Sequence, residues 1–317
     1  VVAGGFFGER WEVRPAAEIA GVADYKSIVE ALRDGFRTEI ESPVRHFHDT
    51  SSVAKLMLMP AWSKAWTGLK TVVVKSDNAA LGLPTVQASY LLIDNGTGAP
   101  VAVMDGTELT RRRTAAASAL AADYLARPDA SHLALVGAGA LGAHFARAHA
   151  AVRPIKKISI HNRTRGKAEK LAAELRGEGL DAVVAADLES AVRQADIVSS
   201  ITSSTKPGIK GEWLKPGTHV DLAGAFTPLM RETDGDVVAK SRVFVDTRHG
   251  AEAEAGDLLQ ARDEGKFDFK NIQADLYELC RGAAQGRKTA GEITLFKSCG
   301  SAVEDLATAT MVYLRCK

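Results

Sequence analysis

The segment His132–Thr164 constrains the fold of this chain more than any other. An apolar strand, Leu133–Val136, runs into the sequence GAGALG, and a helical stretch and a second strand follow. This order of elements with GxGxxG spacing is typical of a dinucleotide-binding βαβ unit. In such a unit Gly137 permits a tight turn, Gly139 lets the backbone approach a pyrophosphate, and Gly142 allows close packing of the helix on the strand. The pyrophosphate lies on the helix N-terminus, where free N–H groups and the dipole favour an anion.

The residues that follow the second strand of this unit favour NADP(H) over NAD(H). A carboxylate normally binds the ribose 2′-hydroxyl of NAD at that position, whereas this sequence has Asn162, Arg163 and Thr164, followed by Arg165 and Lys167. A carboxylate would repel a 2′-phosphate, but an arginine can bind it through charge-assisted hydrogen bonds. We therefore predict NADPH as the cofactor, with NADH bound more weakly. The alternative is a solvated basic turn at the end of a strand.

Composition and charge exclude several classes of protein. The chain has 317 residues, enough for two domains, and a formal net charge of +1, which gives no reason to expect a nucleic acid or an anionic membrane as partner. No apolar run is long enough to span a bilayer, and Val1–Gly5 lack the basic start of a signal peptide. Cys280, Cys299 and Cys316 are odd in number and lack metal-ligand spacing, so we expect a reduced cytoplasmic protein without a metal site.

The first third of the sequence predicts a small α+β domain. Residues Tyr25–Ile40 have helical periodicity, and four strand-like segments follow, at 55–59, 70–74, 88–93 and 100–104. Asp94–Gly98, between the last two, is typical of a hairpin turn. We therefore expect an antiparallel sheet in this domain.

From Leu109 the sequence predicts alternating strands and helices, which indicates a parallel sheet. The predicted strands are 133–136, 157–161, 182–185, 197–200, 219–222 and 242–245; the clearest helices are 114–125, 167–175 and 188–193. Six strands match a doubly wound sheet. We expect the last helix, Ser301–Tyr313, to return to the first domain. The predicted fold is thus α/β, with a Rossmann-type doubly wound parallel sheet (residues 114–300) inserted into a smaller α+β substrate-binding and dimerisation domain (residues 1–113 plus 301–317).

Ligands of open α/β sheets bind outside the carboxyl ends of the strands. There the loops 200–202 and 223–225 follow the fourth and fifth predicted strands, and we expect them beside the nicotinamide. The first domain offers cations that suit a carboxylate substrate: Arg45 in a turn-like stretch, Lys70 in an apolar strand, and Arg113 before an alanine-rich helix. The alternative is that these cations are solvated or form ordinary ion pairs. Spacing marks no role for His46, His48 or His249, and Trp62 and Trp66, at helical spacing, are expected in the core or an interface.

Several motifs in order resemble one family over nearly the whole chain. They are Leu109-Thr110 with Arg113–Ala122, the GAGALG run, Glu212–His219, and Thr294–Gly300 with Glu304-Asp305. This set resembles the ornithine cyclodeaminase/mu-crystallin family. The resemblance implies a nucleotide-binding domain inserted into a substrate domain that also forms a homodimer.

The resemblance also implies roles for individual residues. Arg45, Lys70 and Arg113 take the positions that bind the substrate carboxylate and line the active site. Glu254 matches an acidic residue that reaches the ligand pocket. The positions that match cofactor contacts are Thr85, Arg113, Ala140, Leu141, Thr202, Ala223 and Ser298, beside Gly224 and the residues already named in the βαβ unit.

One residue departs from the cyclodeaminase pattern. Phe226 stands where ornithine cyclodeaminases have an aspartate for acid/base chemistry, and a phenyl ring cannot exchange a proton. The sequence around it resembles the imine-reducing members, so we expect NADPH-dependent reduction of a cyclic ketimine carboxylate, with Phe226 as an apolar wall, and a role in proline metabolism. The alternatives are an amino-acid dehydrogenase or ornithine cyclodeaminase of the same family, and a non-catalytic NADPH-dependent binding protein of mu-crystallin type.

Overall fold

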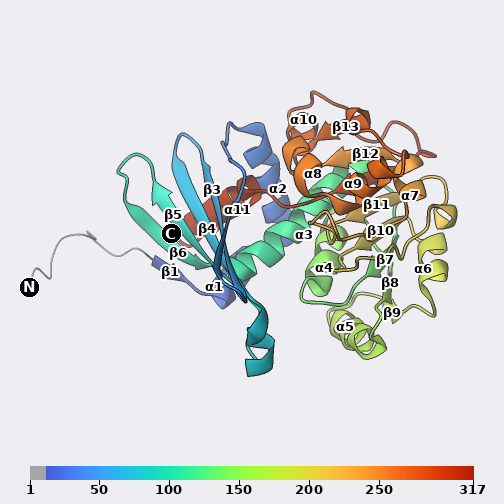
Figure 1. Cartoon of the computed structure of the whole chain (residues 1–317), viewed down its shortest axis with the longest axis horizontal. Coiled ribbons are helices and arrows are strands. Elements are labelled where there is room, and N and C mark those ends of the chain that lie inside the picture. The colour runs from blue at the N-terminus through green and yellow to red at the C-terminus, as the bar shows by residue number, and fades with distance from the viewer. Residues whose placement is uncertain (1–11) are drawn as a thin grey trace, which may run out of the picture. The chain divides into compact units, whose positions relative to one another are not determined.

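The computed structural model describes residues 12–317, which divide into two compact units (Figure 1). Unit 1 is the chain up to Arg113 together with Ser301–Lys317, and unit 2 is Thr114–Gly300. The chain passes from unit 1 to unit 2 inside helix α3 (Gly106–Leu125). The expectation about a signal peptide concerns Val1–Gly5, which lie outside the described residues.

Unit 1 is built on a six-stranded sheet with the order β1-β6-β5-β4-β3-β2. The strands are β1 (Glu12–Arg14), β2 (His46–Ser51), β3 (Ala54–Trp62), β4 (Trp66–Lys75), β5 (Val86–Asp94) and β6 (Pro100–Asp105). The sequence predicted an antiparallel sheet of the four central strands, so it missed both edge strands, and the antiparallel pairing is wrong at β1 but holds at β2. Strand β1 pairs with β6 in parallel, and β2 is exposed along its whole length, so it has no apolar alternation that could reveal it.

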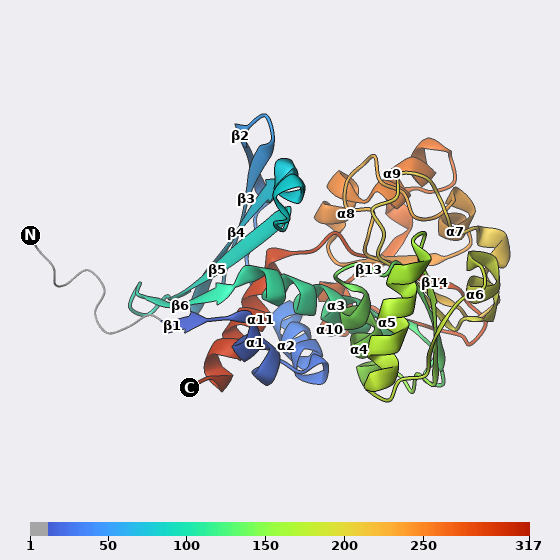
Figure 2. The same ribbon diagram turned by 90° about the horizontal axis from the view of Figure 1, so that it is seen from below.

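The two faces of this sheet differ in how deeply their side chains are buried. Along β4, Gly68, Lys70 and Val72 are buried, whereas Leu69 and Thr71 between them are only half-buried. Helix α11 (Ala302–Arg315) packs on the buried face against β3 and β4 and also against helix α2 (Tyr25–Arg37), and Figure 2 shows both helices with α1 (Ala16–Val22) on one side of the sheet. Among residues 12–113 and 301–317, no α-helix covers the opposite face (Figure 2).

Two local predictions in unit 1 need correction. Trp62 and Trp66 are not on a helix: they end β3 and begin β4, on either side of a tight hairpin. Helix α3 begins at Gly106 rather than Thr114, because the Asp105 carboxylate accepts the backbone N–H groups of Thr107 and Glu108 and so caps the helix eight residues earlier.

Unit 2 contains an eight-stranded, all-parallel sheet with the order β13-β12-β14-β11-β10-β7-β8-β9. The strands are β7 (His132–Val136), β8 (Lys157–His161), β9 (Ala182–Val184), β10 (Ile197–Ser200), β11 (His219–Leu222), β12 (Arg242–Val245), β13 (Ile272–Asp275) and β14 (Thr294–Lys297). The prediction of six strands is wrong, because the short segments IQAD and TLFK were not recognised as strands; both are held by pairing with neighbouring strands.

Helices cover both faces of this sheet, with α4 (Gly142–Val152) and α6 (Leu188–Gln194) on opposite faces (Figure 1). The other helices of unit 2 are α5 (Arg165–Gly177), α7 (Gly235–Ala239), α8 (Arg248–Glu254), α9 (Gly256–Asp263) and α10 (Leu276–Cys280). The chain runs from β7 outward through β8 to β9 and then returns to β10 on the other side of β7. The switch point of a doubly wound sheet therefore lies between β7 and β10.

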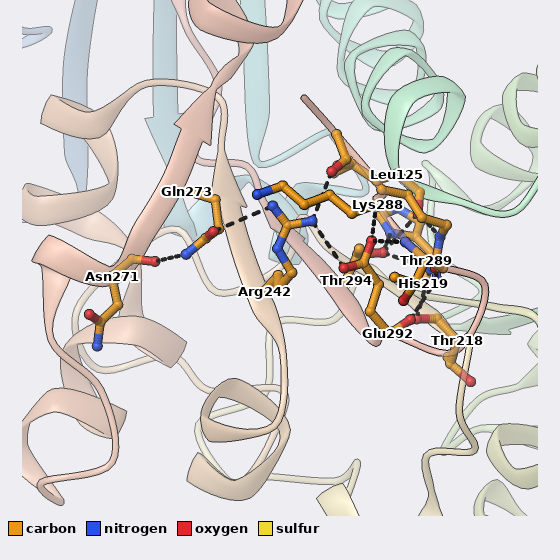
Figure 3. Close-up of polar contacts among 12 residues, drawn as sticks. Leu125, Thr218, His219, Arg242, Asn271, Gln273, Lys288, Thr289, Glu292 and Thr294 are labelled. Carbon is orange, nitrogen blue, oxygen red and sulfur yellow. Dashed lines mark hydrogen bonds and ion pairs between the residues drawn. The ribbon is translucent and has the colours of Figure 1, made fainter. Parts of the chain in front are cut away.

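The amino-terminal edge of this sheet is closed by a polar network (Figure 3). Buried His219 at the start of β11 bonds through Nδ1 to Oγ1 of Thr294 (3.0 Å), and that hydroxyl donates to the carbonyl of Leu125 (2.9 Å). Arg242 bonds to Glu292 (3.1 Å), whose carboxylate also accepts the backbone N–H groups of the 288–289 turn. All of these hydrogen-bond partners belong to the protein itself. The amino-terminal edge of the sheet is therefore closed, and the carboxyl-terminal edge is the one available to a ligand.

Within residues 12–317, the structure contains no helix long and apolar enough to cross a membrane.

Candidate active site

Two buried cations of unit 1 share one carboxylate. Lys70 on β4 places its Nζ 2.7 Å from Oδ2 of Asp305 on α11, and Arg113 on α3 places its Nε 2.8 Å from Oδ1 of the same residue. Arg113 also bonds through Nη1 to Glu304 (2.6 Å). Three elements distant in sequence thus meet in one cluster of two cations and two carboxylates, with no net charge. We call Lys70, Arg113, Glu304 and Asp305 the buried ion cluster.

Burial and neighbouring charges shift the pKa values of Lys70 and Arg113 in this cluster. Burial and the charge of the Arg113 guanidinium lower the pKa of Lys70 to about 8, although the carboxylate of Asp305 opposes both effects. Burial opposes ionisation of Arg113 too, but the carboxylates of Asp305 and Glu304 raise its pKa above the ordinary value. A lysine with a pKa near 8 exchanges its proton readily close to neutral pH, which suits acid/base chemistry.

The other predicted site residues of unit 1 lie differently. Arg45 is half-buried, donates to Sδ of Met57 (3.9 Å), and its charge also lowers the pKa of Lys70. Thr85 is exposed after the short helix η1 (Ser76–Leu81), where its carbonyl accepts the N–H of Lys75 (2.8 Å). The structure therefore brings Lys70, Arg113 and Arg45 into one electrostatic environment and leaves Thr85 apart from it.

The glycine-rich loop of unit 2 has the geometry of a phosphate-binding turn. Gly137 has φ of +112°, and a Cβ there would lie 3.0 Å from the carbonyl oxygen of Ile201. Gly139 and Ala140 are exposed, and nothing lies within 4 Å of a Cβ placed on Gly139. The backbone is thus open to a pyrophosphate at this position. Helix α4 starts at the next turn, after Leu141.

The third glycine of the loop has a different neighbour from the one predicted. A Cβ on Gly142 would lie 2.6 Å from Cδ2 of Leu171, which belongs to helix α5. Gly142 therefore permits close packing of α4 on a second helix rather than on a strand.

Of the residues that follow β8, Asn162 forms hydrogen bonds within unit 2, whereas the side chain of Arg163 is exposed. Asn162 accepts the N–H of Ala138 (3.1 Å) and donates to the carbonyl of Thr164 (2.9 Å), so it shapes the glycine-rich loop. Arg163 is exposed and forms no ion pair with any residue between 12 and 317, whereas Arg165 pairs with Glu169 (2.9 Å). A pocket of about 410 Å³ beside the loop is lined by residues that include Ala138, Gly139, Ala140, Lys167 and Lys170.

Buried carboxylates that the sequence analysis missed hold the loops at the carboxyl edge of the sheet. Ser298, a predicted cofactor contact, donates to Asp246 (3.2 Å), which also accepts the N–H groups of Cys299 and Gly300. Thr202 and Gly224, two further predicted contacts, both donate to Glu232. Apolar periodicity cannot find such residues. The one hint is Lys297, a charge inside the strand TLFK, which lies 3.6 Å from the buried carboxylate of Asp257 and whose charge acts on Glu232.

Three further predicted residues also lie in unit 2. Ala223 is buried directly after β11, and Phe226, three residues later, is 46% exposed. Glu254 is the half-buried last residue of α8. The exposure of Phe226 means that its phenyl ring is available to a ligand.

These features match a known family of proteins. The model of the ornithine cyclodeaminase/mu-crystallin family matches residues 11–317. This chain belongs to that family. The predicted family membership and α/β fold with a parallel sheet are therefore confirmed.

Its relatives include imine reductases and an amino-acid dehydrogenase. The chain is 39% identical over 297 residues to a Δ1-pyrroline-2-carboxylate reductase of Paracoccus denitrificans, covering 93% of this chain and 94% of that protein. Its structure is similar (TM-score 0.91, 32% identity, 96% and 97% covered) to that of Δ1-pyrroline-2-carboxylate reductase of Thermococcus litoralis in complex with NADH and L-proline. An archaeal alanine dehydrogenase dimer with bound NAD is also similar (TM-score 0.90, 30% identity, 96% and 95% covered).

Proposed function

We propose that this protein is an NADPH-dependent imine reductase. Its substrate is a cyclic ketimine carboxylate, Δ1-pyrroline-2-carboxylate or Δ1-piperideine-2-carboxylate, and its product is L-proline or L-pipecolate. The observation that carries the proposal is the pair of buried cations, Lys70 and Arg113, joined by Asp305 in a chain of this family. The similar structure in complex with NADH and L-proline supports the same chemistry.

The cations fit a substrate with a carboxylate next to a basic nitrogen. Asp305 and Glu304 occupy Nε and Nη1 of Arg113, which leaves Nη2 for a substrate carboxylate. The buried ion cluster carries no net charge. The negative charge of a substrate carboxylate would therefore be balanced by the positive charge of Arg45. We propose that Arg45 and Arg113 hold the carboxylate and so fix the imine carbon in position. Lys70, with its pKa of about 8, holds a proton that it can share with the ring nitrogen.

The cofactor site is assigned to the carboxyl edge of unit 2. The open backbone at Gly139 fits a pyrophosphate, and the nicotinamide supplies a hydride when it is bound. Arg163 is the residue that favours NADPH, because it is exposed and forms no ion pair among the described side chains. Phe226 would give the imine ring an apolar wall, and Glu254 would reach the ligand from α8.

We propose that the protein forms a homodimer through the sheet of unit 1. On the face opposite α11, half-buried apolar side chains from neighbouring strands surround a hollow of about 390 Å³; they include Leu69, Leu91, Pro100 and Val103. Burial of this face against a second copy would remove apolar surface from water. A similar structure, that of an archaeal alanine dehydrogenase, is a dimer.

The second candidate is an amino-acid dehydrogenase, which the similarity to the alanine dehydrogenase favours. The two activities differ in their nitrogen source. A dehydrogenase running in the reductive direction needs a 2-oxo acid and ammonia, whereas a cyclic imine already contains its nitrogen.

The experiment that tests the proposal follows the absorbance of reduced nicotinamide. Purified protein is given Δ1-pyrroline-2-carboxylate with NADPH or NADH, and pyruvate with ammonia in a parallel assay. We expect rapid turnover of the imine without ammonia and faster turnover with NADPH. Turnover only with pyruvate and ammonia would identify a dehydrogenase, and NADPH binding without any turnover would identify a ligand-binding protein.

A further inference from the structure

Glu232 is a buried carboxylate that receives hydrogen bonds from the loops after β10 and β11. Its Oε1 accepts from Ser200 Oγ (2.6 Å), from the backbone N–H of Thr202 (2.6 Å) and from Thr202 Oγ1 (2.9 Å). Its Oε2 accepts from the backbone N–H groups of Gly224 (2.8 Å) and Ala225 (3.3 Å). Each oxygen therefore serves one loop, and the carboxylate joins the two.

The surroundings hold Glu232 itself in place. The carboxylate of Asp257 accepts the backbone N–H groups of Glu232 (2.8 Å) and Thr233 (2.9 Å), and lies 3.6 Å from the ammonium of Lys297. Burial raises the pKa of Glu232, and the charge of Lys297 opposes this shift. A Cβ on Gly224 would lie 2.1 Å from the carbonyl oxygen of Thr202 and 2.4 Å from Oε1 of Glu232, so the loops approach each other too closely for a side chain.

The position of these loops indicates which half of a dinucleotide they face. The switch point lies between β7 and β10, and a dinucleotide lies across it. The glycine-rich loop after β7 and the residues after β8 face the pyrophosphate and the adenosine. The loops after β10 and β11, on the other side of the switch point, face the nicotinamide half.

We propose that Glu232 is a positioning residue that holds the two nicotinamide-binding loops at a fixed separation. It touches neither cofactor nor substrate in this role, and acts through Thr202 and Gly224. The inference rests on the proposed function, because it requires that a nicotinamide dinucleotide binds at the carboxyl edge of unit 2.

Glu232→Gln tests the inference with a side chain of the same size. One of the two oxygens becomes an amide nitrogen, which is a donor. Whichever oxygen the nitrogen replaces, it faces a backbone N–H, that of Thr202 or that of Gly224, and cannot accept a hydrogen bond from it. One of the two loops therefore loses its hydrogen-bond acceptor. The probes are NADPH and adenosine 2′,5′-bisphosphate, which has the adenosine half but no nicotinamide. We expect the Kd of NADPH to rise about tenfold, as for the loss of a buried charge-assisted hydrogen bond, and the Kd of adenosine 2′,5′-bisphosphate to stay within about twofold.

The matched control is Asp196→Asn. Asp196 also accepts two backbone N–H groups, those of Ser131 (3.0 Å) and His132 (3.1 Å), but it lies at the amino edge of the sheet. This variant should bind both probes like the wild type. If Glu232→Gln does not fold, Ser200→Ala removes one of the same hydrogen bonds and should show a smaller shift confined to NADPH.

The outcomes separate the inference from the proposed function. Wild-type protein that fails to bind NADPH would refute both. Wild-type binding with a parallel loss of both probes in Glu232→Gln, or with no loss of either in the folded variant, would refute the positioning role alone. A loss confined to NADPH in Glu232→Gln and absent in Asp196→Asn supports it.

Discussion

The Nζ of Lys70 lies 2.7 Å from Oδ2 of Asp305, and the two side chains are 1% and 0% exposed. Strand β4 and the last helix are thus joined at the point where the proposed chemistry takes place. The pairing also explains how a lysine can remain charged in the core of unit 1, because an unpaired buried ammonium would give up its proton.

The first prediction concerns the pH dependence of Asp305→Asn. If the protonated form of Lys70 is the active one, kcat/KM of the wild type falls as the pH rises through about 8. Asp305 raises the pKa of Lys70 against burial and Arg113, so its neutralisation should move this fall to lower pH. The measurement is kcat/KM for imine reduction against pH.

Glu304→Gln is the control for this prediction. Glu304 bonds to Arg113 but has no bond to Lys70, so its loss should move the fall in kcat/KM less than the loss of Asp305 does. Equal shifts in the two variants, or no shift in Asp305→Asn, would contradict a specific effect of Asp305 on Lys70.

The second prediction concerns Arg113→Met. This change leaves Glu304 and Asp305 with one buried cation between them, and an uncompensated buried charge costs about 3–5 kcal/mol of unfolding free energy. Urea unfolding measures the loss, and the double variant with Glu304→Gln should recover part of it. Stability equal to the wild type would show that the ion pairs contribute little. The proposed carboxylate binding further requires that kcat/KM falls in any folded Arg113 variant.

The third prediction concerns the choice of cofactor. Arg163→Ser should weaken NADPH binding by roughly ten- to a hundredfold, which corresponds to about 1.5–3 kcal/mol for hydrogen bonds to a charged group, and should leave NADH nearly unchanged. Arg165→Ser is the matched control, because Arg165 already pairs with Glu169. Fluorescence titration of both cofactors gives the four affinities. Equal losses for NADPH and NADH in Arg163→Ser would refute the contact with the 2′-phosphate.

The fourth prediction concerns the sheet of unit 1. Leu91→Asp places a charge in the apolar hollow opposite α11 and should convert the proposed dimer to a monomer, because burial of an unpaired carboxylate is costly. Leu314→Asp is the control, since Leu314 is an exposed leucine on α11. Light scattering after gel filtration gives the masses. A wild-type monomer, or a Leu91→Asp dimer, would contradict this interface.

Local patterns in the sequence were sufficient for the central elements of both units. The GAGALG run with its flanking strands predicted the βαβ unit, and the strands at 157–161 and 219–222 have the bounds that were expected. In both strands apolar and polar side chains alternate, a pattern that can be recognised without knowledge of the neighbouring strands. Strand β14 (TLFK) was missed because its two apolar residues are adjacent and do not alternate with polar ones, and the strand is held by pairing with β11 and β12 on both sides.

The sequence by itself determined the nucleotide-binding unit, the family, and the residue types of the candidate site. Only the tertiary structure decided their electrostatics. Lys70, Arg113 and Asp305 lie on three elements separated by up to 235 residues, and the pKa of Lys70 depends on burial and on charges that those elements bring together. The proposed role of Glu232 likewise depends on hydrogen-bond donors in the loops after β10 and β11. No local sequence pattern predicts these contacts, because they form only when the strands of the sheet come together.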